Sequence, residues 1–145
     1  MDDPLALDRQ VCFALAAASR SVVALYRPIL EPLGLTHPQY LVMLSLWEKS
    51  PRRVGEIADA LYLDSATLSP LLKRLQSAGL IERVRDSADE RALHITLTPE
   101  GTALRKQAEL VPGHVVARLG VPVRDLEDLR DRLNDLLQRT AKLQV

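Results

Sequence analysis

Three hydroxyl side chains and two basic side chains fall within one short stretch of the sequence. The hydroxyls alternate at its beginning and the cations follow: Ser65, Thr67, Ser69, Lys73 and Arg74. Hydroxyl groups at the start of a helix either accept hydrogen bonds from its free backbone N–H groups or bond to phosphates and base edges of DNA. Lysine and arginine neutralise phosphate charge. The residue types therefore allow two interpretations, a capped surface helix or a helix that contacts DNA.

A second candidate for chemistry is Cys12, the one cysteine among 145 residues. A single thiol excludes an intramolecular disulfide and any multi-cysteine metal site. Judged from the residues alone, a helical cysteine with Leu15 and Ala16 on its own face is usually a small buried hydrophobe. Reactive cysteines need a nearby cation or donor, and Arg9 is the only basic residue close to it in the predicted helix. The local sequence favours a packing role.

The sequence gives little support for a metal site or for enzyme catalysis. His37, His94 and His114 are scattered without the spacing of metal ligands, so no metal site is expected. The sequence has no glycine-rich phosphate loop, no nucleophile elbow and no paired-carboxylate signature. We therefore expect a protein that is not an enzyme and that needs no cofactor.

Length and composition indicate one ordinary globular domain. The 145 residues are 47% hydrophobic and 26% charged. Basic and acidic residues balance at 19 each, so a DNA-binding face would have to arise from spatial sorting of charges. The sequence predicts no membrane span, and Met1-Asp2-Asp3 lacks the basic start of a signal peptide. We expect a cytoplasmic protein.

The hydroxyl-bearing stretch lies within a pattern of helix, stop and hairpin. Leu71, Leu72 and Leu75 recur at the spacing of one helical face, and Gly79 can end the helix. Residues 81–85 and 93–97 alternate as strands do, around a charged loop at 86–91. A short helix over 54–61 precedes the stretch by the few residues that a helix-turn-helix requires. Pro70 predicts either a start near Thr67 or a bend. The layout is that of a winged helix-turn-helix.

Longer helices are expected on both sides of this lobe. They are predicted over residues 5–30, from Thr36 to about 50, over 99–119 with a kink at Pro112-Gly113, and from Val121-Pro122 to Leu143. The terminal helices carry more apolar surface than one small lobe can bury. Packing within one chain would explain it. We favour a dimer, because a two-fold protein presents two recognition helices to two half-sites.

The predicted fold class is therefore mainly α with a small β-hairpin. We expect a single chain, 1–145, in which segments 1–34 and 99–145 form dimerisation helices. The segment 35–98 forms the winged helix-turn-helix lobe that binds DNA.

Short runs along nearly the whole chain resemble the MarR family of regulators. The resemblance extends from Gln10 to about Leu137, and its runs are Gly34-Leu35-Thr36, Pro38-Gln39-Tyr40, Leu46-Trp47-Glu48, 61–65, 67–75, Gly79-Leu80-Ile81 and Asp89-Glu90-Arg91. With Cys12-Phe13 in the first helix, the chain looks most like the organic hydroperoxide resistance repressors. The resemblance implies a dimeric repressor of peroxidase genes, released when a peroxide oxidises the cysteine of the first helix.

Cys12 falls where this family has its peroxide-sensing cysteine. The resemblance implies that its thiolate becomes a sulfenic acid, which a low-molecular-weight thiol converts to a mixed disulfide. The chain lacks the second cysteine of the two-cysteine branch, so it resembles the one-cysteine type. Tyr26 matches a tyrosine that supports the thiolate. Two further family tyrosines are replaced here, by Ala16 and by His37. His37 can compensate as a donor or a cation, or it can be a helix-start residue that faces solvent.

The hairpin adds two candidates for DNA contact. Arg91 resembles the arginine that the family places in the minor groove, and Asp89 can orient its guanidinium. The alternative is a weak local ion pair. The partners expected are a second copy of the chain, a near-palindromic double-stranded operator, an organic hydroperoxide and a small thiol, without a membrane.

Two other functions remain open. The first is a repressor released by a small apolar or phenolic ligand, with Cys12 only packing. The second is a cysteine-dependent enzyme using Cys12 with His37, for which the sequence shows neither an orienting acid nor an oxyanion site.

Overall fold

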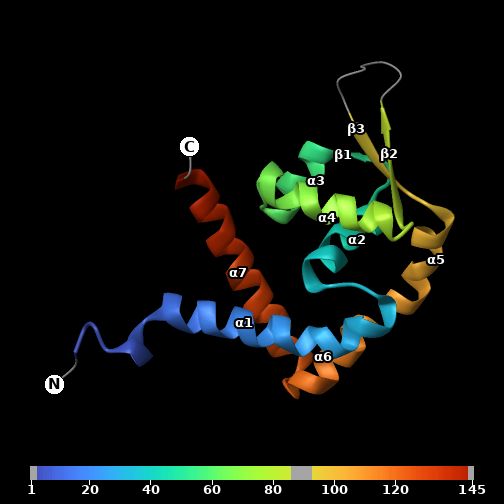
Figure 1. Ribbon diagram of the computed structural model, residues 1–145. Coiled ribbons are helices and arrows are strands. Elements are labelled where there is room, and N and C mark those ends of the chain that lie inside the picture. Colours follow the sequence, from blue (N-terminus) through green and yellow to red (C-terminus); the bar gives the residue numbers. More distant parts are fainter. Residues whose placement is uncertain (1–2, 86–92, 144–145) are drawn as a thin grey trace. The chain divides into compact units, whose positions relative to one another are not determined.

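The computed structural model describes residues 3–85 and 93–143 (Figure 1). The chain forms two compact units, Met1–Val111 and Pro112–Val145. The first unit contains η1 (Leu7–Arg9), α1 (Val11–Leu30), η2 (Glu31–Leu33), α2 (His37–Glu48), β1 (Arg52–Arg53), α3 (Val54–Leu61), α4 (Ser65–Ser77), β2 (Ile81–Arg85), β3 (Leu93–Leu97) and α5 (Pro99–Ala108). The other two elements are α6 (Val111–Leu119) and α7 (Val123–Leu143).

The mainly helical fold with a small sheet confirms the predicted class. The expected hairpin pairs β2 with β3 in antiparallel register, Arg83 opposite Ile95. Sequence analysis missed β1, which pairs with the other edge of β3 and gives the strand order β1-β3-β2. Two residues are too few to show an alternating pattern, so β1 could not be read from the sequence.

The core of the first unit joins α2, α3 and α4 to the sheet. Its largest side chains are at most 2% exposed and include Met43, Leu46, Ile57, Leu68, Leu72, Leu75, Ile81 and Ile95. The predicted start of α2 is confirmed by a capping box. The Gln39 N–H donates to Thr36 Oγ1 at 3.3 Å, and the Thr36 N–H donates to Gln39 Oε1 at 3.0 Å. This cap fixes where α2 begins beside the end of α1.

The first helix begins later than the sequence predicts. We expected a start near residue 5, but α1 begins at Val11, after the 3₁₀ turn η1. The side chain of Gln10 donates to the carbonyls of Pro4 and Ala6, at 2.9 and 3.0 Å, and its own backbone is extended. These bonds satisfy carbonyls that a continuous helix would otherwise use. The helix then runs through Pro28 to Leu30.

The expected kinked helix over 99–119 is two helices. α5 ends at Ala108 and α6 begins at Val111, so the break precedes Pro112. Proline is tolerated in the first turn of a helix, where its missing N–H would be unbonded anyway. Pro112 therefore lies in the first turn of α6 instead of inside a bent helix.

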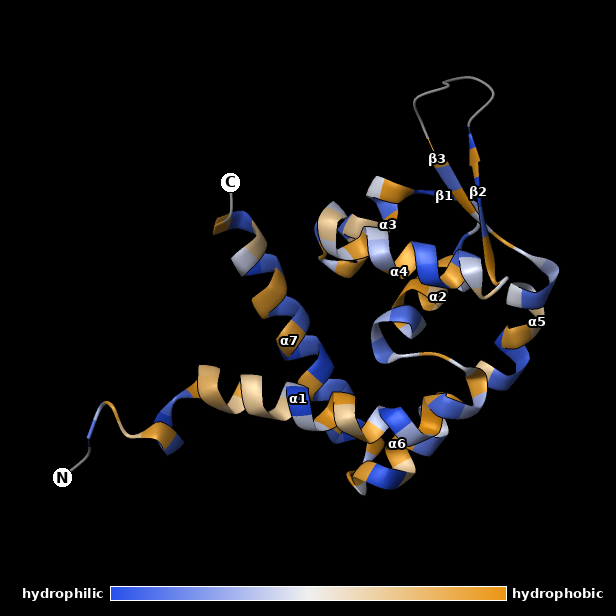
Figure 2. Cartoon of the chain, in the orientation of Figure 1, coloured by the Kyte–Doolittle hydropathy of each residue, from blue (hydrophilic) through white to orange (hydrophobic). Residues whose placement is uncertain are grey.

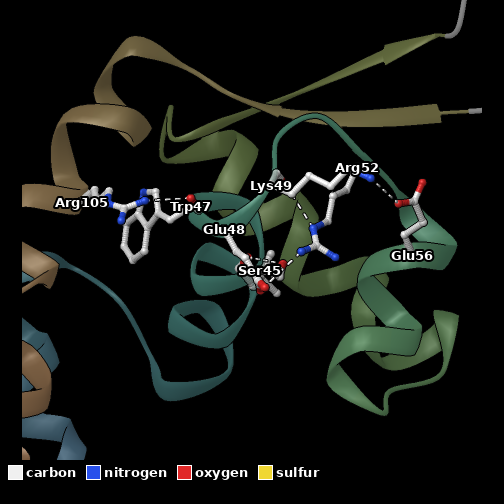
Figure 3. Close-up of polar contacts among 8 residues, drawn as sticks. Ser45, Trp47, Glu48, Lys49, Arg52, Glu56 and Arg105 are labelled. Atoms are coloured by element: carbon white, nitrogen blue, oxygen red, sulfur yellow. Dashed lines mark hydrogen bonds and ion pairs between the residues drawn. The ribbon is translucent and has the colours of Figure 1, made fainter.

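The end of α2 is held by two arginines and a tryptophan (Figure 3). Arg105 of α5 donates to the Trp47 carbonyl at 2.8 Å, and Arg52 of β1 donates to the Lys49 carbonyl at 3.1 Å. The Trp47 indole N–H donates to the Gly101 carbonyl at 2.9 Å. Cations at a helix C-terminus satisfy its free carbonyls and oppose its negative dipole end. These contacts join α2 to both β1 and α5.

The longest helices are apolar along exposed surface (Figure 2). α7 is an amphipathic helix of 21 residues, and none of its described residues is buried. The segment Val11–Leu33 is long and apolar enough to cross a membrane by length and composition alone, with mean hydropathy 1.3. The sequence was expected to contain no membrane span, and one helix of this kind is weak evidence against that expectation, because the core helix of a soluble protein meets the same criteria.

Candidate functional site

The first candidate surface is the start of α4. Asp64 caps the helix, since its Oδ1 accepts a hydrogen bond from the Thr67 N–H at 2.7 Å. Hydrogen bonds from Thr67, the backbone N–H first, lower the pKa of the Asp64 carboxyl below its ordinary value. The cap is thus an aspartate that sequence analysis did not single out. The hydroxyls of Ser65, Thr67 and Ser69 are not needed for that role.

All five candidate side chains of α4 are exposed. The buried face of the helix consists of Leu68, Leu71, Leu72 and Leu75. The opposite surface carries the three hydroxyls at the N-terminal end and the two cations further along: Ser65, Thr67, Ser69, Lys73 and Arg74. One helix therefore anchors itself in the core and presents hydroxyl and cationic groups to solvent.

Pro70 neither starts nor ends this helix. α4 begins at Ser65, so the expected start near Thr67 is wrong. Pro70 removes one backbone N–H in the second turn, yet the helix continues to Ser77. The buried leucines on both sides of Pro70 explain why the helix continues, because tertiary packing outweighs local propensity.

The structure describes the two strands of the hairpin, 81–85 and 93–97, and does not test the two DNA contacts predicted between them. Asp89 and Arg91 lie outside the described residues. Arg83 pairs across the hairpin with Ile95, which is fully buried. Its Nε and Nη2 atoms are buried too, without a hydrogen-bond partner among the described residues. Directly opposite residues share a face of the sheet, so Arg83 faces the core side of the sheet.

A second candidate site is an aromatic cluster where α1 meets α2. The Tyr26 and His37 rings lie 4.8 Å apart in an edge-on arrangement, and the Tyr26 and Tyr40 rings lie 5.9 Å apart. Burial raises the pKa of Tyr26. The pKa of Tyr40 is raised mainly by burial and also by the negative charge that Tyr26 carries when ionised. Both phenols therefore keep their protons at neutral pH and can donate hydrogen bonds.

Burial favours the neutral form of His37 in this cluster. Burial lowers the pKa of its imidazole below the ordinary value of 6.5. A lowered pKa favours the neutral imidazole, which can donate a hydrogen bond, over the cation at neutral pH, and the ring is half-buried and not fully turned to solvent. Tyr40 is a third ring that sequence analysis used only as part of a family motif.

A groove opens beside His37. Its volume is about 480 Å³, and it is lined by Val23 and Arg27 of α1, by Glu31 of η2 and by residues 34–38. Arg27 and Glu31 are exposed at its wall, and no ion pair joins them among the described contacts. Sequence analysis missed Arg27, although it directly follows Tyr26. The groove combines apolar walls with one guanidinium and one carboxylate.

Cys12 lies far from this cluster within its own chain. Cys12 and Tyr26 are 14 positions apart on the continuous helix α1. At 1.5 Å per residue they are separated by about 21 Å along the axis. The thiol is exposed. The structure therefore brings Tyr26 and His37 together, and one chain alone does not bring Cys12 to them.

No group of three or more potential ligand side chains that could hold a metal occurs in the described ranges 3–85 and 93–143. These candidate sites can do hydrogen-bonding, electrostatic and thiol chemistry.

Comparisons with known proteins agree with a winged-helix regulator. A family model described as transcriptional regulator SarA/Rot matches residues 24–108. The organic hydroperoxide resistance transcriptional regulator of Bacillus subtilis is 41% identical over 136 residues, covering 94% of this chain and 92% of that protein. A MarR-family regulator from Rhodococcus sp. RHA1 superposes with a TM-score of 0.81 at 26% identity, over 91% of this chain and 95% of that one. The chain belongs to the MarR family.

A further MarR-type relative has been solved on DNA. Reduced AbfR of Staphylococcus epidermidis, bound to DNA, is 35% identical with a TM-score of 0.75, over 93% of this chain and 94% of that one. Its overoxidised form was also solved bound to DNA, and matches with a TM-score of 0.74. The present chain is a MarR-type transcriptional regulator, and its relatives are named as regulators rather than enzymes.

Proposed function

We propose that this protein is a homodimeric repressor that binds double-stranded DNA through α4 and senses organic hydroperoxides through Cys12. The observation that carries the proposal is the separation of the exposed Cys12 from the Tyr26–His37 pair along one apolar helix. Two copies of α1 can bring these groups together where one cannot. The proposal places the protein in the cytoplasm, where its DNA is.

The DNA-binding part of the proposal rests on α4. Its leucine face is buried, and its hydroxyls and cations are exposed on a helix that is already capped by Asp64. A recognition helix contacts base edges with its N-terminal residues, and cations further along neutralise phosphates. AbfR, solved bound to DNA in two structures, supports DNA binding by this chain. Ser65, Thr67 and Ser69 are assigned to bases or phosphates, and Lys73 and Arg74 to phosphates.

The dimer rests on apolar surface that a single chain leaves exposed. Val11 is 77% exposed, Phe13 and Leu15 are each 41% exposed, and α7 has no buried residue. Exposed apolar patches of this kind mark interfaces between proteins. A second copy of the chain can cover this surface, because a two-fold interface pairs the same patch of both subunits.

A sensing site shared between two chains follows from the same geometry. A thiolate needs hydrogen-bond donors or a cation to form at neutral pH. The phenol of Tyr26 and the neutral His37 are such donors, and they lie about 21 Å along α1 from Cys12 of the same chain. Two antiparallel copies of α1 would bring Cys12 of one protomer to the donors of its partner.

The chemistry at that site is a two-electron oxidation. The Cys12 thiolate attacks one peroxide oxygen, the O–O bond breaks, and the alcohol leaves after taking a proton. Sulfur gains the S–O bond of a sulfenic acid. A small thiol then attacks this sulfur, forms a mixed disulfide and releases water. No second cysteine competes for the sulfenic acid, because the chain has one cysteine.

Release from DNA is assigned to the mixed disulfide. A bulky adduct between packed helices cannot be absorbed without moving them, because protein interiors are close-packed. Their movement changes the spacing of the two α4 helices and so the match to two half-sites. AbfR was solved on DNA even when overoxidised, which supports assigning release to the larger adduct.

The decisive experiment measures operator binding by the reduced protein before and after one equivalent of an organic hydroperoxide, with and without a small thiol. We expect binding to be lost only when the thiol is present, and mass spectrometry to find the thiol on Cys12. The Cys12→Ser variant should bind DNA and ignore peroxide. Loss of binding with an unmodified Cys12 would contradict the proposal.

The groove beside His37 favours one second candidate function. Its volume of about 480 Å³, apolar walls and exposed Arg27 suit a small apolar or phenolic ligand that carries an acidic group. In that case the wild type and Cys12→Ser would release DNA equally with the ligand, and Arg27→Gln would respond less.

A further inference from the structure

Tyr62 occupies an unfavourable backbone position between α3 and α4. Its φ of 56° and ψ of 39° lie in the left-handed region, and among the described residues it is the one non-glycine with a positive φ. There the Cβ of an L-residue crowds its own backbone, so glycine usually ends a helix in this way. The conformation is firmly set, because the Tyr62 N–H bonds to Asp59 at 3.3 Å and the Leu63 N–H to Ala58 at 2.9 Å.

The side chain of Tyr62 is largely exposed. It is 59% exposed, and no side-chain hydrogen bond or ring contact joins it to the rest of the described chain. The other two tyrosines pack together between α1 and α2. Two hydrogen bonds that end α3 account for the left-handed backbone, but they do not require an aromatic side chain. A largely exposed tyrosine at a position where glycine costs less points to a role for its ring at a binding surface.

The position of Tyr62 suggests which surface that is. It precedes Asp64, the cap of α4, by two residues, and the exposed Ser65 and Thr67 follow directly. The short turn fixes the Cα–Cβ direction of Tyr62 relative to the start of α4, and only two side-chain torsions remain free. A phenol held beside a recognition helix is a rigid, uncharged hydrogen-bond donor.

We propose that the Tyr62 hydroxyl donates a hydrogen bond to a phosphate of the bound DNA, next to the point where α4 enters the major groove. This inference rests on the proposed DNA binding through α4. Tyrosine is among the side chains that hold DNA phosphates, and such contacts set orientation without reading sequence. The contact fixes the depth and register of α4, so the hydroxyls at its start meet the base edges.

Two substitutions of Tyr62 distinguish the effect of its hydroxyl on DNA binding from the effect of its left-handed backbone on stability. Tyr62→Phe removes one oxygen and keeps the ring, and Tyr62→Gly removes the ring and relieves the backbone. Binding is measured to a duplex selected from a random pool by the wild-type protein and to a random-sequence duplex of equal length. Lys73→Ala serves as a charged comparison. Gln107→Ala, an exposed change on α5, is the matched control.

We expect Tyr62→Phe to weaken binding to both duplexes by about three- to tenfold for each half-site engaged, as one lost hydrogen bond predicts. The slope of affinity against salt concentration should not change, because a neutral donor releases no counterion. Lys73→Ala should reduce that slope by about one for each half-site engaged. Tyr62→Gly should bind as weakly as Tyr62→Phe, or more weakly, while melting about 2–4 °C higher.

Several results would overturn the inference. Wild-type affinity in Tyr62→Phe would show that the hydroxyl makes no contact. Weakening confined to the selected duplex would mean base reading rather than phosphate binding. A melting temperature lowered in Tyr62→Phe would indicate a structural role. If the wild type binds DNA and Tyr62→Phe binds it equally well, the inference about Tyr62 fails while the proposed DNA binding stands. If the wild type binds no duplex, the proposed function fails with it.

Discussion

Gly101 offers the sharpest test of the packing that joins α5 to the winged helix lobe. A Cβ added there would collide with the carbonyl oxygen of Leu80, and it would lie 3.1 Å from the Leu80 carbonyl carbon and 3.3 Å from Leu97 Cδ2. The obstacle is backbone, so no change of rotamer relieves it. That carbonyl also accepts a hydrogen bond from the Thr98 N–H at 3.1 Å. In Gly101→Ala, therefore, α5 must move away from the end of α4.

The size of the effect follows from the contacts that this movement disturbs. Overpacking of a close contact costs about 1–3 kcal/mol. The shift also weakens the cap, in which the Gly101 N–H donates to Thr98 Oγ1 at 3.0 Å, and the bond that the Trp47 indole N–H donates to the Gly101 carbonyl. Each is worth about 1 kcal/mol. Alanine returns roughly 1 kcal/mol of helix propensity. We expect a net loss of about 2–4 kcal/mol.

The measurement is urea unfolding followed by the fluorescence of Trp47, the one tryptophan. It bonds directly to Gly101, so its native emission should also change in Gly101→Ala. Gly55→Ala is the matched control, because Gly55 lies in α3 with nothing within 4 Å of an added Cβ. It should raise stability by about 0.5–1 kcal/mol. Equal stabilisation by both alanines would refute the close approach of α5.

Four further outcomes are expected. Burial lowers the pKa of His37, so it contributes stability that is present above its ordinary value of 6.5 and lost as pH falls through the lower folded value. The urea midpoint should therefore fall less between pH 7.5 and 5 in His37→Asn than in the wild type, and an equal fall would contradict this. Trp47→Phe leaves the Gly101 carbonyl without its donor and should cost about 1–3 kcal/mol in the same unfolding assay. Arg74→Ala should lower the salt slope of DNA binding by about one for each half-site engaged, and an unchanged slope would remove Arg74 from the phosphate contacts. Arg91→Ala should weaken operator affinity by about 1–3 kcal/mol in a binding titration if its side chain reads a groove, and hardly at all if it only pairs locally.

The parts of the fold that could be predicted depend on local patterns. The capping hydroxyl of Thr36 and the spacing of Leu71, Leu72 and Leu75 fixed α2 and α4, because each signal lies within one helix. The paired strands 81–85 and 93–97 were equally local. The start of α1 was misplaced because apolar residues continue the helical pattern before Val11, while the side chain of Gln10 supports a 3₁₀ turn instead.

The candidate site depends more on contacts between distant segments. The five exposed residues of α4 could be named from the sequence because one helix displays them all. Asp64 was overlooked as the cap since the neighbouring hydroxyls are equally good cap residues. Arg27 and Tyr40 became visible only when α1 and α2 were placed side by side. The resemblance to a family named Cys12 and Tyr26 but did not show that one straight helix keeps them apart.

That straight helix has a genetic consequence. If Cys12 of one protomer meets Tyr26 of the other, two different defective copies can restore each other. A dimer that pairs Cys12→Ser with Tyr26→Phe would contain one site with both defects and one site with none. Two alleles that each fail to sense peroxide would then regain a response when expressed in the same cell.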